Sequence, residues 1–167
     1  MVLFNSLPDS ARVWLFAASG PLPASVLDTV RAFLPTWASH GRPVTAEATV
    51  LSDRVLVVAA LISPEDLNAG VSGCGIDAMS HEVESALSKV GLSQPSPLAV
   101  TYRDARGGWS TVSRPVFRRL AAEGAVDGTT HVMDLTPTDL DSLRASGVER
   151  PAAEAWHGRA FGLGVAA

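Results

Sequence analysis

The only cysteine of this 167-residue chain, Cys74, lies between Gly73 and Gly75 in the segment Val-Ser-Gly-Cys-Gly-Ile-Asp of residues 71–77. The thiolate is the nucleophilic form of cysteine, and the N-terminus of a helix favours it. Flanking glycines let a ligand approach the backbone closely. The pattern predicts either a nucleophilic or redox-sensing thiol or a small buried residue in a tight turn, and burial is the commoner state of a free cysteine.

A cysteine nucleophile needs a general base, and three histidines are candidates for that role: His40, His81 and His157. His40 lies three residues after a tryptophan, and His157 directly follows one. We therefore name Cys74, His40 and His157 as candidate catalytic residues. The alternative is that each of these two histidines only ends a helix, where the dipole favours a cation.

The same segment predicts a ligand-binding loop. Backbone N–H groups at the start of a helix can bind an anion. Asp77 is also expected to cap that helix, and its carboxylate would repel an anion there. The candidate ligand-binding residues are Ser72, Gly73, Gly75, Asp77 and His81.

Nucleotide and metal motifs are absent from the sequence. A P-loop needs a lysine after a glycine-rich turn, but the only lysine, Lys89, ends an expected helix with no such turn ahead of it. No Gly-x-Gly-x-x-Gly follows the first apolar segment, and no histidine lies four residues from another. The spacing of Cys74 and His81 matches no standard zinc pattern. The sequence therefore excludes a P-loop ATPase and predicts no cofactor and no metal.

Bulk properties restrict the partners. A net charge of -4 argues against broad nucleic-acid binding. The longest apolar run, residues 55–62, is far below the ~20 residues that span a bilayer. The first residues lack the basic and apolar regions of a signal peptide, so we expect a cytoplasmic protein. Expected partners are a small molecule or a protein, and the mean hydropathy of +0.21 suggests a homo-oligomer.

Hydrophobic patterning predicts strands at residues 11–18, 44–51, 54–62 and 98–103. Residues 44–51 alternate between apolar and polar, residues 54–62 are apolar on both faces, and a tight turn at Ser52-Asp53 should join these two strands into a hairpin. A helix between the first two should break near Leu34, because Pro35 cannot fit its interior, and should end at Gly41. A second helix is expected at residues 78–90, with Asp77 as its cap and Gly91 just past its end. A loop at residues 63–75 precedes it.

This order, β-α-β-β-α-β, is typical of the ferredoxin-like fold. We predict an α+β protein with a ferredoxin-like core at about residues 11–103. A C-terminal hairpin-helix-strand-helix extension, at about residues 104–161, should pack on this core. The whole chain, residues 1–167, is then a single domain, with a two-lobed chain that divides near residue 95 as the alternative.

Several segments together resemble a family of short uncharacterised bacterial proteins, mainly from Bacteroidetes and their relatives, whose members often carry the label ABC transporter ATPase. The resemblance spans about residues 10–161. Its motifs are Trp37-x-x-His40-Gly41, the run from Ser72 to Asp77, Phe117-x-x-Leu120 with Glu123-Gly124, and Glu154-x-Trp156-His157 ending in Phe161.

The resemblance implies a bacterial protein but supplies no activity. Ser72-Gly73 is similar to the start of the ABC signature Ser-Gly-Gly-Gln, and Cys74-Gly75 departs from it. The family usually has serine where this chain has Gly75, so a mechanism that needs that hydroxyl is in doubt.

The function expected from the sequence is a small cytoplasmic binding or regulatory module with a pocket at the loop of residues 72–77. The first alternative is an enzyme or redox sensor that uses Cys74. The second is a structural subunit of an oligomer.

Overall fold

The computed structural model describes residues 2–61 and 71–164. The chain forms two compact units: unit 1 comprises residues 1–94 and 137–145, and unit 2 comprises residues 95–136 and 146–167. The first boundary, between Gln94 and Pro95, lies where the two-lobed alternative divides the chain. The single domain stays a prediction.

Unit 1 is built on a three-stranded antiparallel sheet with the order β1-β5-β4. Its strands are β1 (Arg12–Ala17), β4 (Thr45–Leu51) and β5 (Val55–Leu61). Strand β5 is buried along its whole length because it is central and covered on both faces. Ser52 and Asp53 join β4 to β5 in a tight turn with positive φ, which confirms the predicted hairpin.

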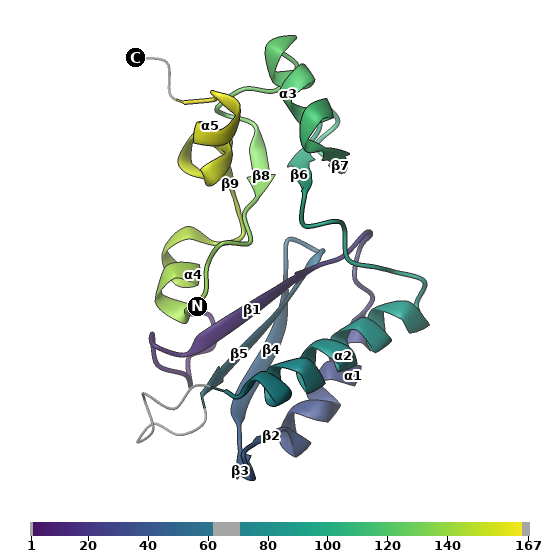
Figure 1. Ribbon diagram of the computed structural model, residues 1–167, viewed down its shortest axis with the longest axis vertical. Helices are drawn as coiled ribbons and strands as arrows, with labels where there is room; N and C mark the ends of the chain where they lie inside the picture. Colours follow the sequence, from purple (N-terminus) through teal and green to yellow (C-terminus); the bar gives the residue numbers. More distant parts are fainter. Residues whose placement is uncertain (1, 62–70, 165–167) are drawn as a thin grey trace. The chain divides into compact units, whose positions relative to one another are not determined.

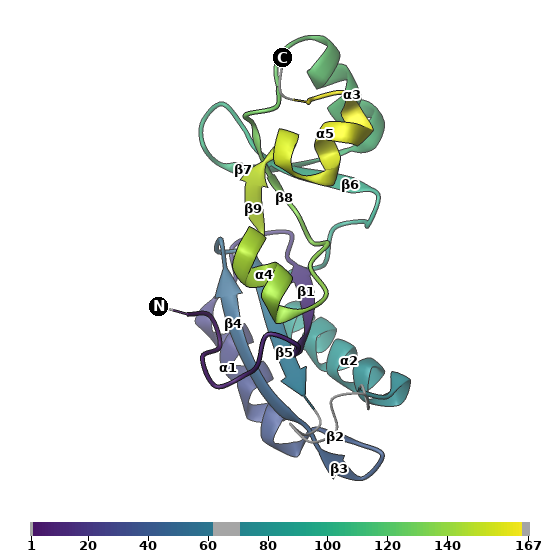
Figure 2. The ribbon, with the colours of Figure 1, turned by 90° about the vertical axis from the view of Figure 1, so that its left-hand side faces the viewer.

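Helices cover both faces of this sheet. Helices α1 (Ala24–Phe33) and α2 (Gly73–Lys89) lie on one face, and α4 (Leu140–Ser146) lies on the other (Figures 1 and 2). The main core includes Val30, Leu56, Val58, Met79 and Val83, all essentially inaccessible to solvent. Among the described residues, no helix is both long and apolar enough to cross a membrane.

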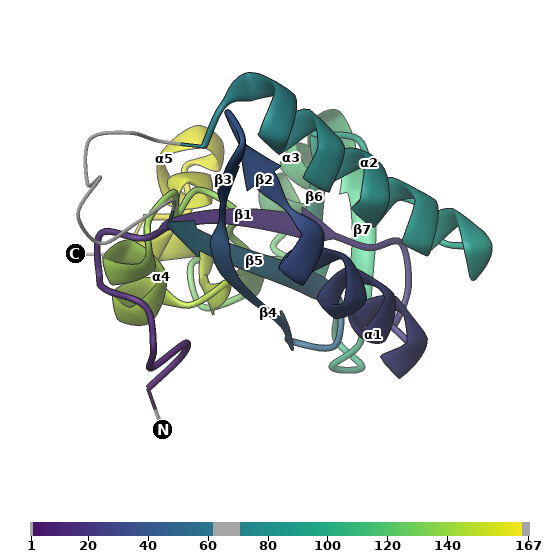
Figure 3. The ribbon, with the colours of Figure 1, turned by 90° about the horizontal axis from the view of Figure 1, so that it is seen from below.

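The break predicted at Pro35 is confirmed, because α1 ends at Phe33 and a 3-10 turn, η1 (Leu34–Thr36), follows. The predicted helix end at Gly41 is wrong. Instead, β2 (Ala38–Ser39) and β3 (Arg42–Pro43) form a short hairpin, which Figure 3 shows beside the start of α2. His40 and Gly41 form its turn, both with positive φ.

The α+β class is confirmed, but a ferredoxin-like sheet is not completed. The order β1-β5-β4 agrees with the first three strands of that fold. The expected fourth strand, β6 (Ala99–Arg103), joins the sheet of unit 2 instead. The free edge of β1 bonds to the segment before α4: Val13 N donates to Thr138 O (3.0 Å), and Leu140 N donates to Ala11 O (2.9 Å).

Unit 2 contains a four-stranded antiparallel sheet with the order β7-β6-β8-β9. Besides β6, its strands are β7 (Trp109–Ser113), β8 (His131–Met133) and β9 (Glu149–Pro151). Helix α3 (Arg114–Ala122), the 3-10 turn η2 (Ala152–Glu154) and helix α5 (Trp156–Phe161) complete it. Its core contains Val100, Phe117, Val132, Ala152 and Leu163.

Candidate functional site

Ser72 caps the start of α2. Its Oγ accepts a hydrogen bond from Gly75 N at 3.1 Å, so it satisfies one of the free N–H groups of the first turn. The predicted cap, Asp77, is wrong because α2 begins at Gly73, well before residue 78. Cys74 is thus the second residue of the helix. It is exposed, which rules out the alternative of a buried cysteine that fills a turn.

Two hydrogen bonds fix the β2–β3 hairpin region to this helix start. The indole Nε1 of buried Trp37 donates to Gly75 O at 2.8 Å, and Ser72 N donates to Oγ of buried Ser39 at 2.8 Å. Gly75 also allows close packing, since a Cβ there would lie 3.1 Å from Val71 Cγ1. These contacts make the hairpin region and the helix start one local structure.

Three candidate residues share an exposed face of α2. Cys74, Asp77 and His81 are all exposed and follow one another at spacings of three and four, which align on a helix. Cys74 and His81 are separated by about 10 Å along the axis, too far for direct proton transfer. His40 is exposed in the hairpin turn, directly after Ser39.

His157 has a different environment from the other candidates. It belongs to unit 2 and is buried, with its ring stacked on Trp156 at a centroid distance of 3.9 Å and near Phe117 at 6.4 Å. Among the described residues, nothing hydrogen-bonds its Nδ1. Burial lowers the pKa of His157 to about 4; the Asp134 carboxylate opposes this shift, and the Arg114 guanidinium adds to it.

His157 is therefore a neutral core residue at pH 7 and not an accessible base for an exposed thiol. The two segments in which a histidine follows a tryptophan differ in burial. In the first, Trp37 is buried and His40 is exposed; in the second, Trp156 is half-buried and His157 is buried. The structure brings together the hairpin region and the start of α2, and it places His157 in the core of unit 2.

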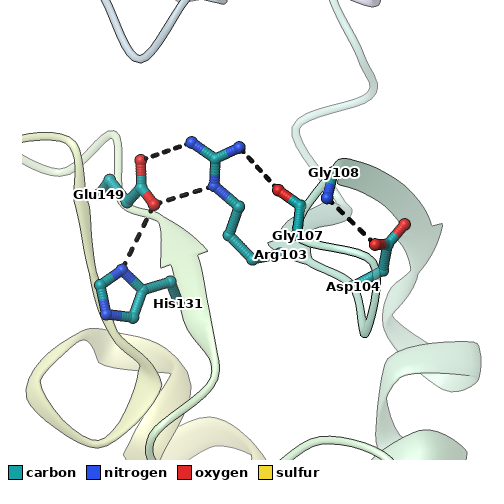
Figure 4. Close-up of polar contacts among 6 residues, drawn as sticks. All are labelled: Arg103, Asp104, Gly107, Gly108, His131 and Glu149. Atoms are coloured by element: carbon teal, nitrogen blue, oxygen red, sulfur yellow. Dashed lines mark hydrogen bonds and ion pairs between the residues drawn. The ribbon is translucent and has the colours of Figure 1, made fainter.

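Unit 2 holds a polar cluster that sequence reasoning missed (Figure 4). The Arg103 guanidinium donates to both carboxylate oxygens of Glu149, at 2.9 and 3.0 Å, and also to Gly107 O at 3.1 Å. His131 Nδ1 lies 3.3 Å from the same carboxylate. Arg103 stacks on Trp109 at 4.0 Å. The cluster connects β6 to β9 across β8, so its clearest effect is to hold the sheet together.

A neighbouring carboxylate in this unit orders the β6–β7 turn. Asp104 accepts hydrogen bonds from Ser110 Oγ (2.8 Å), Arg106 N (2.9 Å) and Gly108 N (3.1 Å). These bonds, that of Ser110 above all, lower the pKa of Asp104. The carboxylate is therefore committed to the turn.

One hollow on the described part of unit 1, of about 410 Å³, is lined by α1, η1 and β4, with Arg31 and Glu47 among its polar residues. Arg31 is already engaged, since its guanidinium donates twice to Ala48 O, at 3.1 and 2.9 Å. Residues 71–77 do not line this hollow. Within residues 2–61 and 71–164, no three His, Cys, Asp or Glu side chains are arranged to hold a metal ion.

Comparison of the chain with protein-family models, curated proteins and solved structures finds no match to any of them.

Proposed function

We propose that this chain is a small binding or regulatory protein and that the start of α2, together with the β2–β3 hairpin, is its contact surface. The observation that carries the proposal is the pair of bonds from Trp37 to Gly75 and from Ser72 to Ser39. Buried polar groups joined in this way hold the local backbone in one arrangement. A rigid backbone lowers the entropic cost of binding.

The side chains on this surface suit a polar ligand or a protein partner. The surface presents four exposed groups: the Cys74 thiol, the Asp77 carboxylate and the imidazoles of His40 and His81. The pocket expected at residues 72–77, action in the cytoplasm and membership of the short bacterial family all stay predictions.

A thermal-shift screen of the intact chain against a metabolite library tests the proposal. We expect at least one compound to raise the Tm of the native chain and to raise it less in Cys74→Ser and His40→Ala. Lys89→Gln, at the opposite end of α2, is the matched control and should retain the full shift. A library without such a compound, or shifts of equal size in all four proteins, would refute the proposal.

The second candidate function is a cysteine-dependent enzyme or redox sensor, which the exposure of Cys74 favours over a purely structural role. The same compounds distinguish the two. An enzyme would convert one of them, and Cys74→Ser would lose turnover while still binding it. A binding module would leave the compound unchanged.

A further inference from the structure

Two arginines of α3 lie over aromatic rings of α5 in unit 2. The guanidinium carbon of Arg114 is 5.1 Å from the centre of the Trp156 ring, and that of Arg118 is 5.6 Å from the centre of the Phe161 ring. Both arginines are exposed. Stacking restrains a guanidinium without using its N–H donors, so these donors stay available to a ligand.

Within the part of the chain that the structure describes, no carboxylate pairs with Arg114 or Arg118. No salt bridge between described residues includes either arginine. An ion pair on α3 joins a different arginine, Arg119, to Glu123 at 3.9 Å. Arg114 and Arg118 are four residues apart on one face, a spacing at which like charges repel. Arg114 is also the first residue of α3, at the positive end of the helix dipole.

The residues beneath the pair do not neutralise it. Trp156 and Phe161 carry no charge, and His157, which stacks on Trp156, is buried. The carboxylate of Asp134, which acts on His157, already accepts hydrogen bonds from Thr136 N and Oγ1 and lies 3.8 Å from Arg150. Two like charges at this spacing, one of them at the positive end of a helix dipole and neither with a carboxylate partner among the described residues, are best explained by an external anion.

The geometry favours a dianion with several terminal oxygens. Residues four apart on a helix are separated by about 6 Å along its axis, so two forks can converge on one group. One guanidinium fork satisfies a single carboxylate, whereas a phosphate monoester carries nearly two charges and three terminal oxygens. A nucleic-acid strand carries a single charge on each of many successive nucleotides. The net charge of -4 on this protein disfavours the binding of such a strand.

We propose that Arg114 and Arg118 form a binding site for a phosphate monoester, carried either by a phosphorylated small molecule or by a phosphorylated side chain of a partner protein. This site is independent of the surface at the start of α2, since it rests on other residues in the other unit.

NMR titration of the intact ¹⁵N-labelled chain tests the site, with inorganic phosphate as the first probe and acetate at equal ionic strength as the control. We expect phosphate to give saturable shifts at the Trp156 indole and at the Nε–H groups of Arg114 and Arg118. Acetate should give much smaller ones. The double variant R114Q/R118Q should bind phosphate at least about tenfold more weakly. Arg106→Gln, an exposed arginine in the β6–β7 turn, should bind like the parent chain.

Two further probes identify the source of the phosphate. Tighter binding of a phosphoserine peptide than of glycerol 3-phosphate supports a partner protein, and the reverse order supports a small molecule. Shifts that do not saturate, or that persist in R114Q/R118Q with its fold intact by circular dichroism, would overturn the proposal. So would a single-stranded oligonucleotide that binds more tightly than both probes.

Discussion

The buried imidazole of His157, whose Nδ1 has no hydrogen-bond partner among the described residues, makes the stability of unit 2 depend on pH. The pKa of this group is about 4 in the folded chain, against 6.5 for an ordinary histidine. Between these values the unfolded chain binds a proton that the folded chain does not. The free energy of unfolding is therefore highest above pH 6.5, falls as the pH drops through this window, and has lost the full contribution below pH 4.

The expected decrease in the free energy of unfolding is large. A difference of about 2.5 pKa units corresponds to about 3 kcal/mol, at 1.36 kcal/mol per unit. Small domains are stable by only about 5–15 kcal/mol, so this one group removes a substantial fraction on acidification. Its cause is the transfer of a cation into a site lined by Trp156, Phe117 and Phe161, where the Nδ1 has no acceptor among the described residues.

Urea unfolding between pH 7 and pH 4, followed through NMR resonances of unit 2, measures this effect. We compare the parent chain with His157→Phe, which retains the ring stacking but cannot bind a proton. The parent should lose about 3 kcal/mol more than the variant over this range. His81→Asn, at an exposed position of α2, is the control and should follow the parent.

A direct titration of the imidazole checks the cause. The ring protons of His157 should titrate near pH 4, and Arg114→Gln should raise that value because the guanidinium disfavours the imidazolium. A His157 that titrates near pH 6.5, or equal pH profiles for the parent and His157→Phe, would refute the reasoning.

Three further predictions concern unit 1. Trp37→Phe leaves the Gly75 carbonyl without its indole donor and should lower the free energy of unfolding by about 1–3 kcal/mol, measured by urea unfolding. Gly75→Ala should destabilise the chain because its Cβ would lie 3.1 Å from Val71 Cγ1, whereas a Cβ at Gly73 meets open space; equal melting temperatures for the two alanine variants would contradict this packing argument. Arg144→Gln removes a guanidinium that donates to three carbonyls of residues 3–7, so amide exchange in that segment should accelerate, and unchanged protection would count against its role.

The local elements of unit 1 could be predicted from the sequence because their signals act over short distances. The alternation of residues 44–51 and the continuous apolar run after it gave the β4–β5 hairpin. Pro35 correctly predicted the break after α1. Gly91, which has a φ of 73°, correctly predicted the end of α2. Each of these depends on backbone geometry or on contacts within a few residues.

The predicted start of α2 was wrong because two residues that can cap a helix, Ser72 and Asp77, precede the same apolar stripe. Contacts remote in sequence favour the earlier one: Ser39 accepts from Ser72 N, and Trp37 donates to Gly75 O, across more than 30 residues of chain. Such contacts override the weak helix propensity of two glycines.

The fourth strand was misplaced for a related reason. The Gly107-Gly108 turn pairs β6 with β7, so the hairpin itself could be predicted. The sheet that this hairpin joins depends on β8, which is far along the chain, and no local pattern specifies it. The cluster of Arg103, Glu149 and His131 follows from that pairing, so it could not be predicted before the sheet was known.

The exposure of Cys74 likewise depends on α2 starting at Gly73, which places the thiol on the outer face of the first turn. The sequence alone does not place His40 beside the candidate residues at the start of α2. That proximity depends on the hydrogen bonds of Trp37 and Ser39, which join the hairpin region to the helix.

The most direct test of the proposed contact surface is the rate at which a thiol reagent labels Cys74 in the native chain, measured with and without a compound that raises the Tm. We predict ready labelling of the free native chain at neutral pH and slower labelling once the compound is bound. A thiol that reacts only after denaturation, or at the same rate with and without the compound, would contradict the account.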